Sequence, residues 1–317
     1  MTAPFRLGTR GSPLALAQAR LAAAALTAAH GIVVEIVPIV TTGDRIQDRP
    51  LADIGGKALW TKELDAALLD GRIDAAVHSM KDVETRLADG IVIAAMLPRA
   101  DVRDRLLGAA SIAALPHSAR VGTSSPRRAA QLRHLRPDLV VVPLRGNVAT
   151  RMAKLAAGEA DATLLAAAGL DRLGLDEGAA IPTEAVLPAP AQGAVGLTAR
   201  AADGVTLAQL AAIDHAPTSF AVGLERALLA ALLADCHSSV AALAVFDPGG
   251  IDFRAEILLP DGSERRTVRV MLPSASFEAA TAAVSDAAAE LLASASPALA
   301  ALFGAGARAS AERRPAG

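Results

Sequence analysis

The sequence predicts an α/β protein built from two similar α/β domains and a small C-terminal α+β domain. Short apolar strands alternate with helical segments through the first two thirds of the chain, as in sheets with many parallel strands. One strand-to-helix opening occurs twice, near residues 8 and 122. The chain has 317 residues, which is too long for one typical core, so we expect two or three domains of roughly 100 residues.

The first domain begins with a predicted strand at residues 5–8, followed by a helix from Ser12-Pro13. Serine as the N-cap and proline at the first helical position are a common helix start. The apolar, β-branched residues 32–40 predict a second strand, 61–69 have helical spacing, and 73–77 begin another buried strand. This alternation predicts a largely parallel sheet.

A second unit starts near residue 100 and opens in the same way as the first. The matched residues are Gly8, Thr9, Ser12, Pro13, Gln18 and Arg20 in the first opening, and Gly122, Thr123, Ser125, Pro126, Gln131 and Arg133 in the second. Two ordinary helix caps and coincidence are one explanation, and two similar domains are the other. In the second case, paired helix N-termini with free N–H groups favour an anionic ligand.

A third, smaller unit follows the Pro/Gly-rich segment 187–193, which we interpret as a linker between domains. We expect a helix at 220–233, strands at 240–246, 253–259 and 267–272, a helix at 277–292, and a disordered tail from residue 305. The expected division is 1–97 plus 190–214 for domain 1, 98–189 for domain 2, 215–304 for domain 3 and 305–317 for the tail.

Composition excludes several classes of protein. We expect no membrane span, because no run of about 20 apolar residues lacks charge or helix punctuation. The first residues do not have the pattern of a secretory signal, and a single cysteine cannot form an internal disulfide, which favours the cytoplasm. Because the net charge is −2, there is no global basic field to attract nucleic acid, and any anion site must be local.

Residues 120–151 contain seven arginines, and Asp138 is the only acid among them. Arg127 and Arg128 fall in the first turn of a predicted helix, where a cation opposes the helix dipole, so the segment indicates binding of carboxylates or phosphates. A solvated, arginine-rich surface is the alternative. Nucleic-acid binding is disfavoured, since the chain has no tyrosine and one tryptophan for base stacking.

The run from His78 to Val83 follows a predicted strand, at the end where open α/β sheets bind ligands. Lys81 and Asp82 supply a cation and a carboxylate able to transfer protons. A solvated Lys-Asp turn remains the alternative. His78 is most simply a packed histidine, since no second histidine lies at metal-ligand spacing, and we expect no metal site.

Cys236 is the only cysteine and lies between a predicted helix and a predicted strand, next to His237. A lone cysteine is commonly a small buried hydrophobic residue. A position in a loop also allows a role as a nucleophile or attachment point.

Several runs together resemble the porphobilinogen deaminase family in order and spacing, over about residues 5–245. They are Gly8 to Ala15, Gly55-Gly56-Lys57, Lys62-Glu63-Leu64, His78 to Val83, Gly122 to Ser125, Arg127-Arg128, Leu144 to Val148, Ala168-Gly169-Leu170 and Gln192-Gly193-Ala194. The resemblance implies three domains, the first two similar to periplasmic binding proteins. It also implies a dipyrromethane cofactor joined by a thioether to the residue that matches the family's cysteine, Cys236.

The implied reaction joins four porphobilinogen molecules head to tail with loss of ammonia, and water then releases hydroxymethylbilane. Each pyrrole carries two carboxylates, so arginine-rich binding surfaces are expected. The resemblance also implies a cytoplasmic monomer that acts in porphyrin and haem biosynthesis and hands its product to uroporphyrinogen-III synthase.

Matching positions assign a role to each site residue. Asp82 is the catalytic carboxylate, which stabilises positive charge on pyrrole intermediates and accepts their N–H bonds. Cofactor binding is assigned to Cys236, Ser79, Lys81, Asp82, Thr123, Ser124, Ser125, Arg127, Arg128 and Arg145. Substrate binding is assigned to Arg10, Ser12, Lys57, Trp60, Arg145, Arg151, Arg172 and Gln192.

The sequence departs from the family pattern at three places. Trp60 stands where phenylalanine is frequent, and Glu84 stands where proline usually follows the Lys-Asp-Val motif. The cysteine loop lacks the usual glycine before Cys236 and the usual proline after it. Two rival interpretations remain: a two-lobed anion-binding protein without turnover, and a regulator that binds nucleic acid.

Overall fold

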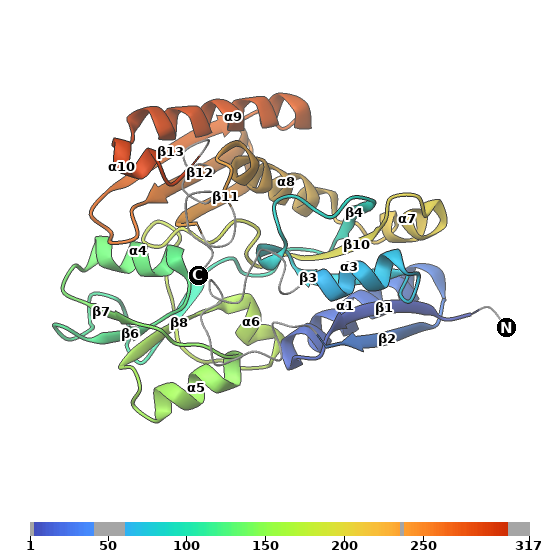
Figure 1. The fold of residues 1–317 in the computed structure, drawn as a ribbon, viewed down its shortest axis with the longest axis horizontal. Helices are drawn as coiled ribbons and strands as arrows, with labels where there is room; N and C mark the ends of the chain where they lie inside the picture. The colour runs from blue at the N-terminus through green and yellow to red at the C-terminus, as the bar shows by residue number, and fades with distance from the viewer. Residues whose placement is uncertain (1–2, 41–60, 235–237, 304–317) are drawn as a thin grey trace, which may run out of the picture. The chain divides into compact units, whose positions relative to one another are not determined.

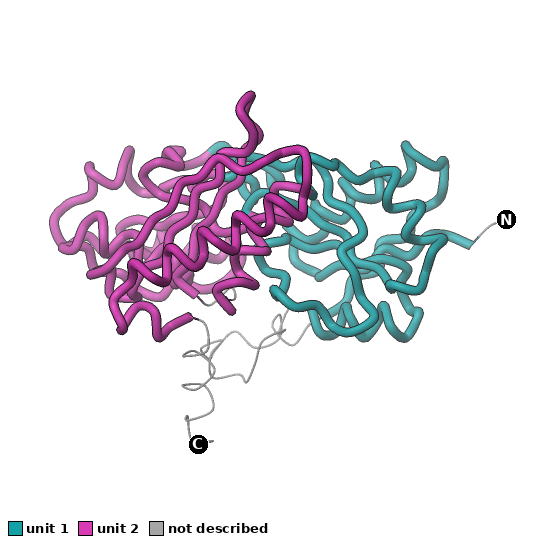
Figure 2. The backbone as a smooth tube through the Cα atoms, turned by 90° about the horizontal axis from the view of Figure 1, so that it is seen from above, with its two compact units in different colours: residues 1–102, 168–176, 192–219 teal, residues 103–167, 177–191, 220–317 magenta. Residues whose placement is uncertain are grey.

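The computed structural model of the chain describes residues 3–40, 61–234 and 238–303 (Figure 1). The backbone divides into two compact units (Figure 2). The first comprises residues 1–102, 168–176 and 192–219, and the second comprises 103–167, 177–191 and 220–317. The polypeptide crosses from the second unit to the first for the last time after Ala191, which lies within the predicted linker. The division into three domains stays a prediction.

The first unit contains a five-stranded sheet with the order β2-β1-β3-β10-β4. Its strands are β1 (Phe5–Arg10), β2 (Val34–Ile39), β3 (Ala75–Ser79), β4 (Ile91–Met96) and β10 (Val195–Arg200). Its helices are α1 (Pro13–His30), α3 (Lys62–Leu69), the 3-10 turn Met80–Asp82, α7 (Gly204–Ala211) and, from Ala168 on, α6 (Ala167–Arg172).

The second unit contains another five-stranded sheet, with the order β7-β6-β8-β5-β9, and a three-stranded sheet. The five strands are β5 (Asp104–Leu107), β6 (Arg120–Gly122), β7 (Val140–Val142), β8 (Ala162–Ala166) and β9 (Ala179–Ala180). Helices α4 (Pro126–Leu135) and α5 (Val148–Ala156) belong to this part of the unit.

The two five-stranded sheets have the same arrangement of strand directions, which confirms the prediction of two similar α/β domains, although the antiparallel strand next to the centre comes last in the chain in one sheet (β10) and first in the other (β5). In each, the first three strands are mutually parallel, and the last two pairings are antiparallel. Gly8 and Gly122 occupy matching register positions in β1 and β6. A Cβ at either would collide with a buried side chain, that of Ile73 or Leu144, so a larger residue at either position would require that side chain to move.

The expectation of a largely parallel sheet was wrong for half of each sheet. Strand β10 pairs antiparallel with both β3 and β4, and β5 pairs antiparallel with both β8 and β9. Pairing direction depends on where the chain enters the sheet, and strand composition alone does not encode that.

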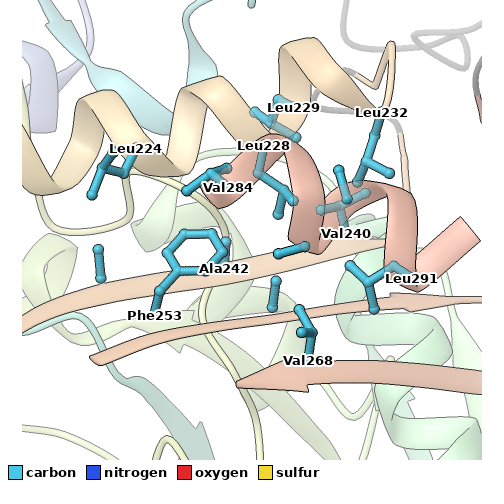
Figure 3. Close-up of a cluster of buried hydrophobic side chains, with 14 of the residues drawn as sticks. Leu224, Leu228, Leu229, Leu232, Val240, Ala242, Phe253, Val268, Val284 and Leu291 are labelled. Atoms are coloured by element: carbon cyan, nitrogen blue, oxygen red, sulfur yellow. The ribbon is translucent and has the colours of Figure 1, made fainter. Parts of the chain in front are cut away.

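The remainder of the second unit is the predicted α+β part. An antiparallel sheet of β11 (Val240–Asp247), β12 (Gly250–Leu258) and β13 (Arg265–Leu272) packs with α9 (Phe277–Ser294), α10 (Pro297–Ala300) and α8 (Ala216–Ala231), which belongs to this unit from Phe220 on. Figure 3 shows Leu224 and Leu228 of α8 above Phe253 of the sheet, and all three side chains are fully buried. Among the described residues, none of the helices combines the length and apolar character needed to cross a bilayer.

Helices α1, α4 and α9 each begin with a serine cap, the first two, at Ser12 and Ser125, as predicted. The Ser12, Ser125 and Ser276 side chains accept hydrogen bonds from the backbone of the first turn of α1, α4 and α9, respectively. In the first two helices a proline occupies the first turn. Helix α1 ends at Gly31, whose φ of 65° is the left-handed conformation that favours glycine at this position.

Candidate active site

A pocket in the first unit lies where β1 and β3 end. The strands are parallel, so their carboxyl ends lie at one edge of the sheet, and the starts of α1 and α3 line the same pocket. The structure thus brings together four predicted site residues, Arg10, Ser12, Ser79 and Asp82. The other lining residues are Leu14, Ala15, Gln18, Thr61, Val77, His78 and Val83.

Gln18 and His78 are pocket residues that the sequence analysis did not assign to the site. The buried Gln18 amide donates a 2.8 Å hydrogen bond from Nε2 to Oγ of Ser79. His78 is 6% exposed, and its Nε2 lies 2.9 Å from Oγ1 of Thr198 on β10. His78 is therefore the packed histidine that was expected, yet it also lines the pocket. One feature of the sequence could have identified Gln18 as a site residue: each of the two openings has a glutamine at the same distance from its capping serine.

Asp82 ends the 3-10 turn that follows β3, and its side chain is exposed beside the pocket. The turn is held by a 3.2 Å hydrogen bond from the Val83 N–H to the Met80 carbonyl, and Met80 is buried beneath it. An anchored turn with an exposed carboxylate suits a group that must meet a ligand. Lys81, in the same turn, is half-buried.

The pKa of the Asp65 carboxyl group on α3 lies above its ordinary value. Burial, followed by the charge of Glu84, raises the pKa of Asp65 to about 6, and a hydrogen bond with Thr61 opposes that rise. The Glu84 carboxylate, which stands where proline is usual in the family, therefore acts on Asp65. At neutral pH the first unit holds an ionised carboxylate at a position that favours the neutral acid.

We expect Asp65→Asn to stabilise the protein at pH 7.5 by about 1 kcal/mol, a value reduced for partial exposure from the shift itself. A folded-state pKa above the unfolded one means that wild-type stability falls as pH rises from about 4 to 6 and stays low above 6. The gain should therefore shrink to about half at pH 5. Urea unfolding at both pH values measures it, with Asp89→Asn, whose side chain is 98% exposed, as control. An equal gain at both pH values would contradict this cause.

In the second unit, the start of α4 gathers the matching polar residues. Thr123 is buried and its Oγ1 accepts a 3.1 Å hydrogen bond from the Ser125 N–H, while Ser124 Oγ donates to the Leu144 carbonyl at 3.1 Å. Ser125 caps the helix. These contacts fix the loop that leads from β6 into α4.

Arg127 and Arg128 are buried and share the carboxylate of Asp104 on β5. Arg127 donates to Asp104 Oδ2 at 3.0 Å, and Arg128 donates to both carboxylate oxygens, at 3.1 and 2.7 Å. Burial lowers the pKa of Arg127, and the charge of Asp104 opposes this effect. A solvated surface is thus excluded for these two arginines. Asp104 lies outside the arginine-rich segment in sequence, and two further arginines of the segment, Arg120 and Arg136, pair with Asp161 and Asp138.

The other predicted binding residues lie elsewhere in the two units. Arg151 on α5 donates to the Gly146 carbonyl at 2.9 Å, and the half-buried Arg145 lies just before that helix. Arg172 at the end of α6 donates to the Gly193 carbonyl at 2.7 Å, and burial lowers its pKa. Gln192 is buried and donates to the Val102 carbonyl at 2.7 Å.

Three predicted site residues, Lys57, Trp60 and Cys236, lie outside the described residues, as does the predicted tail. In the part of the chain that is described, no group of three or more His, Cys, Asp or Glu side chains is placed to hold a metal ion. The binding and catalytic assignments themselves stay predictions.

Comparison with known proteins gives close relatives. Residues 5–208 match the family model described as porphobilinogen deaminase, dipyromethane cofactor binding domain. The porphobilinogen deaminase of Sphingopyxis alaskensis is 59% identical over 287 residues, which cover 87% of this chain and 91% of that protein. The porphobilinogen deaminase of Caulobacter vibrioides is 46% identical over 277 residues, which cover 83% and 86%.

Solved structures align more distantly. The methionine-binding protein MetQ aligns with a TM-score of 0.42 and 14% identity over 65% of this chain and 88% of that one. A periplasmic substrate-binding protein from Coxiella burnetii aligns with a TM-score of 0.39 and 16% identity over 70% and 96%.

Proposed function

The chain belongs to the porphobilinogen deaminase family, enzymes of tetrapyrrole biosynthesis, and we propose that it polymerises porphobilinogen into hydroxymethylbilane. In each of four condensations, a carbon–carbon bond forms between the aminomethyl carbon of one porphobilinogen and the free α-carbon of the preceding pyrrole. Ammonia leaves from the first carbon, and the α-carbon loses a proton. One water molecule then releases the linear product.

The pocket in the first unit is the observation that carries the proposal. It combines the exposed Asp82 carboxylate with Arg10 and Ser12 at the edge of the sheet. The Arg10 guanidinium suits a substrate carboxylate, which it can bind through two hydrogen bonds. Asp82 can accept a hydrogen bond from the pyrrole N–H group and stabilise the positive charge that develops as ammonia leaves.

The second unit supplies groups that fit an anionic dipyrromethane cofactor. Arg127 and Arg128 share one carboxylate, so this pair carries one positive charge in excess. The Nε atom of Arg127 is buried and has no hydrogen-bond acceptor among the described residues, which leaves a donor for a ligand oxygen. When bound, the cofactor provides the free pyrrole α-carbon at which the chain of pyrroles grows. We propose its attachment through a thioether to Cys236, the only thiol of the chain.

Intact mass spectrometry together with an assay of porphobilinogen consumption tests the proposal. We expect the protein to carry an adduct equal to two porphobilinogens less two ammonia molecules, located on the peptide that contains Cys236, and to release about one ammonia per porphobilinogen consumed. An unmodified thiol and binding without ammonia release would favour the two-lobed anion-binding protein.

We further propose that the enzyme works as a cytoplasmic monomer. The single cysteine suits a reducing compartment. Hydroxymethylbilane is a reactive linear product, and transfer to uroporphyrinogen-III synthase is the step that follows from the resemblance. Analytical ultracentrifugation of the loaded protein tests the monomer, and a dimer at micromolar concentration would contradict it.

A further inference from the structure

A chain of buried polar side chains in the second unit joins its two sheets through α4. Glu256 on β12 is 1% exposed and accepts hydrogen bonds from Arg265 Nε at 2.6 Å and from Gln131 Nε2. The Gln131 Oε1 atom accepts from Arg127 at 2.9 Å, and Arg127 donates in turn to Asp104 at 3.0 Å. The contacts thus run from β13 to β5 through five side chains.

The ionised state of the Glu256 carboxylate constrains the orientation of the Gln131 side-chain amide. An ionised carboxylate can only accept hydrogen bonds, so Glu256 requires that the NH₂ group of Gln131 face it. The Oε1 atom of Gln131 must then point the other way, toward Arg127. The charge on β12 therefore favours the Gln131 oxygen as one acceptor of Arg127, beside the Leu187 carbonyl at 2.8 Å and Asp104. The Leu187 carbonyl also accepts from Gln131 Nε2, at 2.9 Å, and favours the same orientation. An amide in place of Glu256 would weaken this constraint, because an amide can donate or accept and carries no charge.

Gln18 and Gln131 occupy the same place in the duplicated openings, six residues after the capping serine. Each holds a predicted ligand-binding side chain of its own unit: Gln18 donates to Ser79, and Gln131 accepts from Arg127. Gln131 also donates a hydrogen bond to Glu256 of β12 and thereby connects α4 to the three-stranded sheet. That sheet follows the segment that contains Cys236.

The cluster also keeps an excess of positive charge. Three guanidinium groups, those of Arg127, Arg128 and Arg265, face the two carboxylates of Asp104 and Glu256. Arg127 is 3% exposed, so any change in its acceptors changes the position of a buried donor that has little other freedom.

We propose that Glu256 and Gln131 are positioning residues for Arg127, and that they orient its guanidinium toward a carboxylate of the pyrrole cofactor. The proposal rests on the proposed function. It assigns to the three-stranded sheet a part in building the cofactor site.

The test is loading of the apoprotein with porphobilinogen, followed by intact mass at a series of concentrations. Glu256→Gln should raise the concentration needed for half loading about tenfold, the scale of one hydrogen bond to a charged group. The matched control is Asp252→Asn, which also turns a carboxylate of β12, ion-paired across to Arg269 of β13, into an amide. Asp252 does not contact α4 through any described hydrogen bond, and this control should load like the wild type.

A swap of the two side chains separates positioning from a loss of folding. In Glu256→Gln/Gln131→Glu, the carboxylate faces Arg127, the new amide donates to it, and the amide oxygen can accept from Arg265. The forced orientation returns, so half loading should return to within about threefold of the wild type. Glu256→Gln added to Arg127→Leu should cause no further loss, because it acts through Arg127.

Normal loading of Glu256→Gln, a swap variant that folds but loads no better than Glu256→Gln, or independent losses in the Arg127→Leu background would each overturn the proposal. Hydrogen exchange of α4 in the apoprotein identifies variants that have lost the fold. If the wild-type protein never acquires the pyrrole adduct, the proposed function itself fails, which is a different outcome from normal loading in Glu256→Gln.

Discussion

Cys236→Ser is expected to give a folded protein that carries no covalent pyrrole and has almost no activity. A thiol is partly ionised near neutral pH, and its thiolate is a strong nucleophile, whereas a serine hydroxyl is not. An ether therefore forms far less readily than a thioether, and the enzyme has no primer on which to build. Intact mass after incubation with porphobilinogen, together with turnover, measures both effects.

Far-ultraviolet circular dichroism that matches the wild type should accompany this loss, because one sulfur-to-oxygen change leaves the helices and sheets intact. The control is Ser238→Ala, two residues along the chain, which should load normally. Full activity of Cys236→Ser would remove the covalent attachment from the proposal and leave only a cofactor held by hydrogen bonds and ion pairs.

Asp82→Asn should lower turnover by at least ~10² to 10³-fold, the usual scale for a positioned acid–base or electrostatic group. Asparagine keeps the shape of the side chain but loses the charge and the proton acceptor. Because Asp82 is exposed at the end of an anchored turn, the substitution should leave the fold and most of the binding intact. Turnover and the masses of the covalent intermediates are the measurements.

Asp82→Glu is the companion variant, since it keeps the charge and moves it by one methylene. It should retain part of the activity and accumulate enzyme-bound intermediates. Near-normal turnover of Asp82→Asn would assign the chemistry to another carboxylate, and Glu84→Gln, two residues along, is the variant that would then identify it.

The sequence predicted those features that depend on neighbours along the chain. Ser12 and Ser125 cap their helices as predicted, because the first turn of a helix lies next to its cap in sequence. The strands near residues 5 and 120 were predicted as parts of the repeated strand-to-helix opening, and the structure has β1 and β6 there. The position of Ser79 and Asp82 at a strand end was predicted, and the parallel pairing of β1 with β3 brings Arg10 to the same edge.

Features that depend on distant partners were not predicted. Asp104 reaches Arg127 and Arg128 across more than 20 positions, and Glu256 reaches Gln131 across 125. Nothing in the local pattern of an acid indicates which buried arginine will meet it. The same applies to β10, whose apolar residues indicate a strand and carry no information on its neighbours in the sheet.

The place of β10 has a consequence for synthesis on the ribosome. This strand, Val195–Arg200, lies between β3 and β4, so the sheet that begins the chain lacks an inner strand until residue 200 has emerged. At about 5–20 residues per second, that delay after β4 lasts roughly 5–20 s. All strands of the other five-stranded sheet, from Asp104 to Ala180, leave the ribosome within the delay. The sheet that is translated first is thus completed only after the strands of the second five-stranded sheet have emerged. Until then, β3 and β4 expose unpaired edges that chaperones can bind.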